Sequence, residues 1–280
     1  MPGIRVVTDS ACDLPGPVVV ENGVSIVPLS IRFGDTELVD GRDLTVEDFW
    51  ARCTKSPVLP ETAAPSPGAF AETFRGLAAG GADGIVCINL ASKLSATIQA
   101  AQAAANDLDG SVPVQVIDSK TASLGQGILV LAAARMAAEG KSMEDVVGTV
   151  TDLVDRVRLI ATLDTLDNLK KGGRIGGAQA FLGSMLSIKP VIQVIDGAVE
   201  QESKQRTRTR SLRYLADKVA AAGAIEGLAV MHAQAPDLNE FLDLLSRTVP
   251  RDQILVGDVG PVIGTHAGPG AIGCAFFAPL

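Results

Sequence analysis

The sequence predicts an α/β protein with a mainly parallel sheet. Short apolar runs rich in β-branched residues alternate with segments of helical periodicity along almost the whole chain, which is typical of strands connected through helices. Several of these runs are apolar without interruption, as in parallel strands that are buried on both faces. The 280 residues are 47% apolar but only 4% aromatic, so aliphatic side chains must fill the core, which favours layered packing of helices on sheets.

The first half of the chain shows this alternation most clearly. Apolar β-branched runs predict strands at residues 4–8, 24–29, 84–90 and 112–118. Apolar residues at helical spacing predict helices at residues 45–55, 67–79, 94–107, 124–139 and 142–157. Gly140 ends the fourth helix, and Ser142 with Asp145 resembles a capping box that begins the fifth.

The second half mixes strands and helices less regularly. Strands are expected at residues 158–163, 187–194, 226–233 and 253–259, and helices at 176–186, 206–222 and 236–248. Residues 198–204 follow the second of these strands after an Asp196-Gly197 pair, which predicts a β-hairpin. We therefore expect an N-terminal α/β domain over residues 1–157 and a C-terminal α+β domain over residues 158–280, with an approximate boundary.

Composition excludes several classes of function. The net charge is −8 and the pI is about 4.8, so the chain lacks the basic surface of a nucleic-acid-binding protein. Its four cysteines, Cys12, Cys53, Cys87 and Cys274, have no C-x-x-C spacing, which favours free thiols over zinc or disulfides. The longest apolar run, GILVLAAA, is too short to span a bilayer. We expect a soluble, cytoplasmic protein with no metal and no cofactor.

Polar residues gather where the predicted parallel strands end, which is where open α/β sheets bind ligands. The four clusters are Thr8, Asp9 and Ser10; Thr62 and Ser66; Ser92, Ser95 and Thr97; and Ser119 and Ser123. Each cluster alone is more typical of a helix N-cap. Four of them at one edge of a sheet favour a ligand site.

The segment GTHAGPGAIG, residues 264–273, contains one of only two histidines. It matches G-x-G-x-x-G literally, but an apolar run follows it instead of the helix that a dinucleotide site needs. Two interpretations remain: a loop whose glycines bring Thr265 and His266 close to a ligand, or a tight turn with an incidental histidine. His232, on an apolar strand, is expected to be structural.

Motifs of common catalytic sites are missing. The chain has no G-x-S-x-G elbow, no H-E-x-x-H and no phosphate-binding P-loop. Asp164, Asp167 and Asp196 could act as paired acids, but LDTLDNLKKGG is better explained as a helix with an acidic start and a basic end. We expect no catalytic residue and no enzymatic activity.

Taken together, the motifs resemble the DegV family of bacterial fatty-acid-binding proteins. The motifs are TDSACDLP, ETAAPSPGAF, ASKLSATIQAA, VIDSKTASLGQG, LDTLDNLKKGGRIGGAQAFLGSMLSIKPV and GTHAGPGAIG, in this order. The resemblance implies two domains with a tunnel between them that holds one long-chain fatty acid, such as palmitate or oleate. Some members present the acyl carboxylate to a separate ATP-dependent kinase, which makes acyl phosphate for phospholipid synthesis. The resemblance also allows transient contact of the protein with a membrane.

By position, the resemblance assigns the fatty-acid carboxylate to Thr62, Ser95 and His266. Two hydroxyls and an imidazole suit this role because a buried carboxylate needs hydrogen-bond donors. The chain departs from the family pattern where LSATI replaces LSGTY, TAAPS replaces TSxPS and GRIGG replaces GRIS. These departures bear on chain length and unsaturation more than on carboxylate binding.

The remaining assignments also follow from the resemblance. The candidate tunnel walls are Leu124, Phe181, Leu182, Met185 and Ile188, for which ordinary core packing is an equal alternative. Arg206 and Arg208 are candidates for docking the kinase or the acyl phosphate, although they could simply form a solvated helix start.

Two other functions stay open. One is an enzyme, kinase-like or carbonyl-binding, that uses His266; the missing phosphate loop argues against it. The other is a regulator that senses lipid supply.

Overall fold

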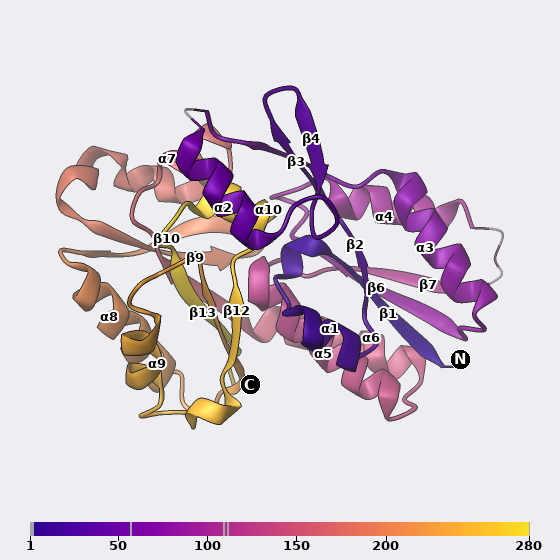
Figure 1. Cartoon of the computed structure of the whole chain (residues 1–280). Coiled ribbons are helices and arrows are strands. Elements are labelled where there is room, and N and C mark those ends of the chain that lie inside the picture. Colours follow the sequence, from indigo (N-terminus) through magenta and orange to yellow (C-terminus); the bar gives the residue numbers. More distant parts are fainter. Residues whose placement is uncertain (1–2, 57, 109, 111, 280) are drawn as a thin grey trace.

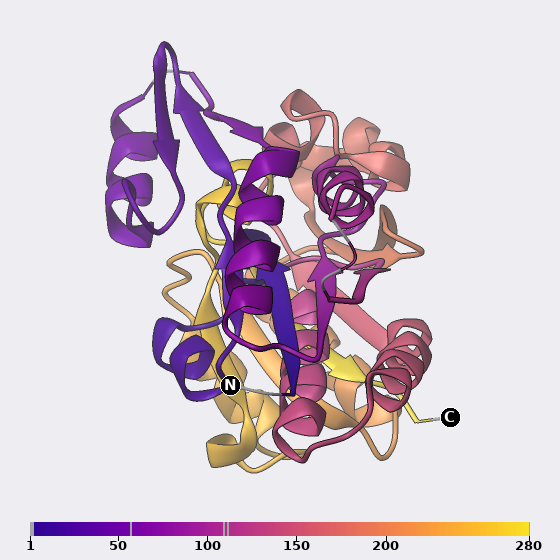
Figure 2. The same ribbon diagram turned by 90° about the vertical axis from the view of Figure 1, so that its right-hand side faces the viewer.

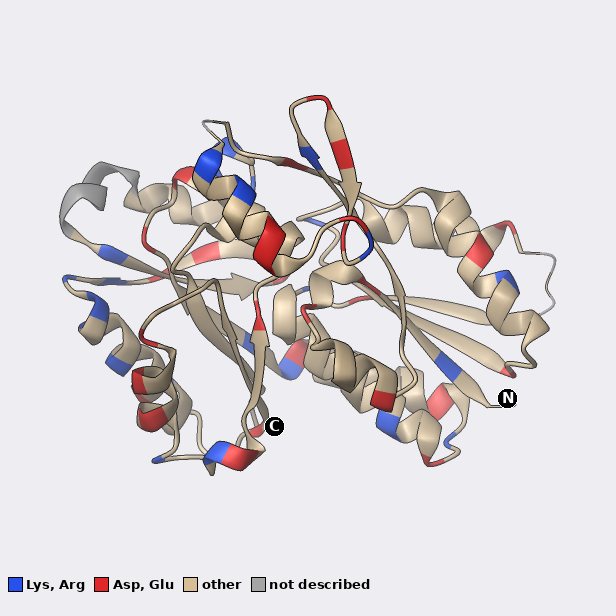
Figure 3. Ribbon diagram, in the orientation of Figure 1, with Lys and Arg blue, Asp and Glu red and all other residues tan. Residues whose placement is uncertain are grey.

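The described part of the chain forms three sheets. The computed structural model describes residues 3–279 except 57, 109 and 111, and for residues 182–187 it describes the backbone but not the side chains. Most strands from the first 118 residues lie on the right of Figure 1, with one hairpin at the top, and those from residue 157 onward lie on the left. Charged residues occupy mainly the outer helices and loops of this view (Figure 3).

The first sheet is entirely parallel and confirms the predicted class. It has four strands in the order β2 (Ser25–Val27), β1 (Ile4–Asp9), β6 (Gly84–Asn89) and β7 (Val114–Asp118). Val7 packs with α3 (Pro67–Ala79) and α4 (Thr97–Asn106) on one face, and its neighbour Val6 packs on the other. Successive side chains of a strand point to opposite faces, so burial on both faces explains the uninterrupted apolar runs.

The second sheet has six strands and is mostly antiparallel. Its order is β10 (Ala198–Gln205), β9 (Lys189–Ile195), β8 (Val157–Thr162), β13 (Ile272–Phe277), β11 (Glu226–His232) and β12 (Leu255–Asp258). Only β11 and β12, among the described pairs of this sheet, run parallel. Helices α8 (Arg208–Ala221) and α9 (Leu238–Leu245) cover one of its faces.

Helix α5 (Ser123–Ala138) joins the two halves. It contacts β1 and β6 of the first sheet and β8, β11 and β13 of the second. Residues 123–131 are therefore buried on every side, as expected for a helix that is apolar all round. Helix α6 (Met143–Arg156) packs beside it, and α1 (Gly16–Glu21) lies nearby.

The third sheet was not predicted. Strands β4 (Thr36–Val39), β3 (Ser30–Phe33) and β5 (Glu61–Ala63) form it, and their hairpin stands out from the molecule beside α2 (Val46–Lys55) (Figure 2). Each strand has three or four residues with few buried side chains, so none produces a clear apolar pattern.

The local predictions had mixed outcomes. Asp196 and Gly197 adopt φ of 48° and 78° in the predicted hairpin turn, and Ser142 Oγ accepts from Asp145 N at 3.1 Å as an N-cap. Residues 176–187 form a 3₁₀ helix, η2 (Gly176–Ser187), instead of an α-helix. The expectation of a loop around His266 was wrong: α10 (Pro261–Ala267) contains it, because Pro261 suits a first helical turn and Gly268 ends the helix at φ 77°.

Three short elements complete the fold. They are η1 (Ser10–Cys12), which follows β1; α7 (Asp167–Lys171), which the acidic-to-basic pattern predicted; and η3 (Arg251–Gln253). None of the described helices is long and apolar enough to cross a membrane.

Candidate functional site

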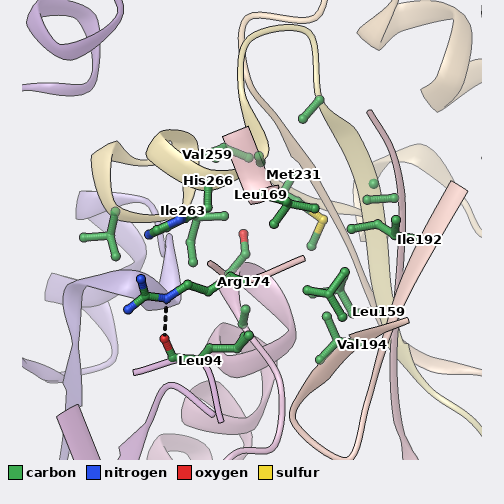
Figure 4. Close-up of a pocket in the computed structure, with 18 of the residues that line it drawn as sticks. Leu94, Leu159, Leu169, Arg174, Ile192, Val194, Met231, Val259, Ile263 and His266 are labelled. Carbon is green, nitrogen blue, oxygen red and sulfur yellow. Dashed lines mark hydrogen bonds between the residues drawn. The ribbon is translucent and has the colours of Figure 1, made fainter. Parts of the chain in front are cut away.

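A largely aliphatic cavity lies where the second sheet meets α10 and the loops after β6 and β7. The space between its walls is about 870 Å³ with the mouth included. Strands β8, β9 and β11 contribute Leu159, Ile192, Val194 and Met231 to the wall (Figure 4). An aliphatic wall of this kind fits a hydrocarbon chain better than a polar ligand.

Part of this cavity is polar, where Thr62, Arg174 and His266 lie close together. The polar lining residues are Thr62, Ser95, Ser123, Arg174 and His266. The Thr62 hydroxyl and His266 Nε2 are 3.0 Å apart. Figure 4 shows His266 and Arg174 on one side of the cavity, across from Leu159 and Met231. The cavity thus has a polar end and a long apolar remainder.

His266 lies in the last turn of α10. Its imidazole packs directly on the backbone of Gly172, where an added Cβ would be 2.3 Å from Nδ1. Burial, and then the nearby charge of Arg174, lowers the pKa of His266 to about 4. The ring is therefore neutral at pH 7, and it offers one N–H donor instead of a charge. Among the described residues, the buried Nδ1 has no hydrogen-bond partner.

Arg174 brings a positive charge to the cavity. It follows α7, and its guanidinium donates from Nε to the carbonyl of Leu94 at 3.1 Å and from Nη1 to the carbonyl of Gly172 at 2.5 Å. These bonds hold the group beside His266 (Figure 4). Arg174 was not among the predicted site residues, although it lies inside the GRIGG motif. Guanidinium groups bind carboxylates and phosphates strongly.

Two serines complete the polar lining. Ser95 lies just before α4; its Oγ is 2.9 Å from Thr97 Oγ1 and accepts from Thr97 N at 3.3 Å. The first turn of a helix favours negative charge nearby. Ser123 begins α5, and its hydroxyl donates to Asp13 at 2.5 Å. Ser95 is therefore better placed than Ser123 to meet an anionic group.

The structure brings together the three residues assigned to a carboxylate, Thr62, Ser95 and His266, in one cavity lining. Of the candidate tunnel walls, Leu124, Phe181 and Ile188 are not among the residues that line this cavity. Leu124 packs against Gly257 in the core, and Phe181 is 2% exposed. Leu182 and Met185 lie outside the residues whose side chains are described. Strands β8, β9 and β11 of the second sheet supply much of the wall instead.

The two candidate docking arginines differ in their surroundings. Arg206 is exposed. Arg208 is bound through Nε and Nη2 to the Asp237 carboxylate, at 2.7 and 3.0 Å. Neither lines the cavity. His232, expected to be structural, lies with its Nε2 3.4 Å from Asp258 on the neighbouring strand.

A groove runs along the outer side of the polar end. Thr62, Arg174 and His266 line both this groove and the cavity, and Lys171 lies in the groove only. The segment before β5 forms its edge, where Val58 is 69% exposed. These three shared residues therefore border both hollows. Across the described residues, no cluster of His, Cys, Asp and Glu could hold a metal ion, and all four cysteines are free thiols.

Comparison with known proteins gives matches over nearly the whole chain. The family model described as "Uncharacterised protein, DegV family" matches residues 3–279. A DegV domain-containing protein of Streptomyces coelicolor is 38% identical over 275 residues, 96% of each chain. The structure described as showing fatty acid binding of a DegV family protein from Thermus thermophilus is 32% identical with a TM-score of 0.91, over 99% of this chain and 100% of that one. A stearic acid-binding protein from Eubacterium ventriosum is 28% identical with a TM-score of 0.87, over 98% of each chain.

Proposed function

This chain belongs to the DegV family, and we propose that it binds a single long-chain fatty acid, such as palmitate or oleate, with the carboxylate at the polar end of the cavity. The observation that carries this proposal is the combination of an aliphatic cavity with a hydroxyl–imidazole pair and a guanidinium in its lining. The acyl chain supplies most of the affinity. At roughly 0.8 kcal/mol per buried CH₂, about 15 methylenes give on the order of 12 kcal/mol, from which the ordering of protein and ligand subtracts several kcal/mol.

The carboxylate is held by Thr62, Ser95 and His266, with Arg174 as its counter-charge. A charge that enters a low-dielectric cavity needs both hydrogen bonds and an opposite charge. Because the neutral imidazole supplies only an N–H, the positive charge comes from Arg174. With a division near residue 157, Thr62 and Ser95 belong to the first domain and the other two residues to the second, so the ligand joins the domains.

The protein acts as a cytoplasmic carrier that presents the carboxylate to an ATP-dependent kinase and has no catalysis of its own. The groove on the outer side supports this role because Thr62, Arg174 and His266 of the polar end also line this groove. A kinase active site seated there reaches the carboxylate and makes acyl phosphate for phospholipid synthesis. Of the two candidate docking arginines, Arg206 is the exposed one and is the candidate contact for the kinase.

Native mass spectrometry of the purified protein, before and after addition of palmitate, tests this proposal. We expect one fatty acid per chain, and loss of that adduct in Thr62→Val/His266→Gln. The control Thr151→Val/His232→Gln makes the same two changes away from the cavity and retains the adduct. A wild-type protein that takes up no fatty acid, or one that hydrolyses ATP without a partner, contradicts the proposal.

A further inference from the structure

The position of α10 determines the geometry of the polar end. The helix has seven residues, and its last turn carries His266. Val262, Ile263 and Ala267 of the same helix line the cavity. A rigid-body shift of this short helix therefore moves the imidazole relative to Thr62 and Gly172. Whatever holds the start of α10 acts on the polar end from a distance.

Asp13 holds the start of α10. It lies just after η1, in the loop that follows β1, and its Oδ1 accepts from the backbone N–H of Gly260 at 3.0 Å. Gly260 is the residue before the first turn of α10. The other carboxylate oxygen accepts from the Ser123 hydroxyl at 2.5 Å, and Ser123 lines the cavity. One carboxylate thus joins the start of α10 to the start of α5.

The backbone around Asp13 is shaped to this contact. A Cβ at Gly260 would be 2.8 Å from Asp13 Oδ1, and a Cβ at Gly257 would be 2.9 Å from the Asp13 carbonyl oxygen. Asp13 and Ser123 have φ of 53° and 51°, in a backbone region that residues other than glycine rarely adopt. Two strained residues facing each other through one short hydrogen bond indicate a local geometry imposed by the surroundings.

A contribution to folding stability does not explain well why a carboxyl group, Asp13, is buried here. Asp13 is 8% exposed, and burial raises its pKa well above the usual range. A buried carboxyl whose oxygens are directed at two specific donors fixes orientation, whereas apolar packing of similar volume is often at least as stabilising.

We propose that Asp13 is a positioning residue for the polar end, which sets α10 so that the His266 imidazole stands between Gly172 and Thr62. At the other end, Asn168 Nδ2 donates to the Thr265 carbonyl at 3.0 Å, so α10 is held at both ends. The inference rests on the proposed function where it concerns fatty-acid affinity, and on the structure alone where it concerns the imidazole.

The test compares Asp13→Ala with Asp40→Ala. Asp40 is a matched control because it is equally buried, at 9%, and lines a second hollow of the molecule together with Asp13, but bonds to Ser10 and Gly41 instead of α10. The affinities of palmitate and of hexadecanol are measured for both variants. Hexadecanol keeps the chain but lacks the carboxylate, so general destabilisation weakens both ligands alike.

We expect Asp13→Ala to weaken palmitate binding by roughly tenfold or more, which corresponds to the loss of one hydrogen bond to a charged group. Hexadecanol binding should weaken far less. Asp40→Ala changes the ratio of the two affinities little. Asp13→Asn restores the ratio because its amide oxygen can still accept from Gly260. Equal losses for both ligands in Asp13→Ala overturn the inference.

A second readout uses no fatty acid. The chain has two histidines, so ¹⁵N-labelled imidazole signals can be assigned with His232→Gln. Asp13→Ala is expected to shift the His266 signals and raise its pKa toward the ordinary value, while Asp40→Ala leaves them in place. Unchanged His266 signals in a folded Asp13→Ala protein refute the positioning role. If wild type binds no palmitate but these signals move, the proposed function fails and the positioning role stands.

Discussion

Substitution of Gly172 by alanine is the most selective perturbation of the polar end. The added Cβ would lie 2.3 Å from His266 Nδ1 and 2.8 Å from His266 Cε1, and both distances are shorter than non-bonded heavy atoms tolerate. Gly172 has φ of −75° and ψ of −8° at the end of α7, so alanine fits the backbone without strain. The main consequence is displacement of the imidazole.

The size of the effect follows from the contact that is lost. Moving the ring out of the way breaks the 3.0 Å contact between His266 and Thr62 and takes the imidazole from the place proposed for the carboxylate. A hydrogen bond to a charged group is worth about 1.5–3 kcal/mol, which corresponds to a loss of roughly 10- to 150-fold in palmitate affinity. Isothermal titration calorimetry with palmitate and with hexadecanol measures this loss and assigns it to the carboxylate.

Gly148→Ala provides the control. Gly148 lies in α6, and a Cβ there meets no atom within 4 Å, so this variant keeps wild-type affinity and gains slightly in helix stability. Palmitate affinity that is unchanged in Gly172→Ala, with the protein folded, would show that His266 does not contact the carboxylate.

Three further predictions concern charge, pH and chain length. Arg174→Gln is expected to weaken palmitate binding roughly 10- to 100-fold through the loss of charge-assisted hydrogen bonds, and to raise the pKa of His266, because the Arg174 charge helps to lower it. Titration calorimetry measures the affinity and ¹⁵N NMR the pKa. An unchanged affinity contradicts the role of Arg174. The pKa of His266 is about 4 in the folded protein, below its ordinary 6.5, so between these pH values the unfolded chain binds a proton that the folded protein does not. The free energy of unfolding therefore falls by up to about 3 kcal/mol as pH drops from 6.5 to 4. Denaturation of wild type and His266→Gln across this range measures the difference, and an identical dependence of unfolding free energy on pH in the two proteins contradicts it. Each methylene removed from palmitate should weaken binding about fourfold, and a competition series of saturated acids in which affinity does not follow length contradicts an aliphatic cavity.

Strong local patterns explain what the sequence predicted of the fold. The runs at β1 and β6 are apolar on both faces because helices cover both faces of the sheet, and this doubles the signal. Strands β3 and β5 have no such signal, since each is short and pairs mostly with another short strand. Helix α10 was hidden because its glycines suggest a loop, whereas Gly264 is required for packing: a Cβ there would be 2.8 Å from the ring of Trp50.

The polar end was predictable only in part. Thr62, Ser95 and His266 follow from motif positions, and the structure places them in one cavity lining. Arg174 and Asp13 had no comparable signal, because their roles depend on contacts with residues 80 and 247 positions away in the chain. Long-range contacts of this kind leave no periodic pattern in the sequence.

A crystal structure of the protein with palmitate tests the central claim most directly. The account predicts one acyl chain in the cavity beside Leu159, Ile192 and Met231, with its carboxylate within hydrogen-bond distance of Thr62, Arg174 and His266. A lipid bound at another surface, or a chain in the cavity with its carboxylate at the opposite end, would contradict it.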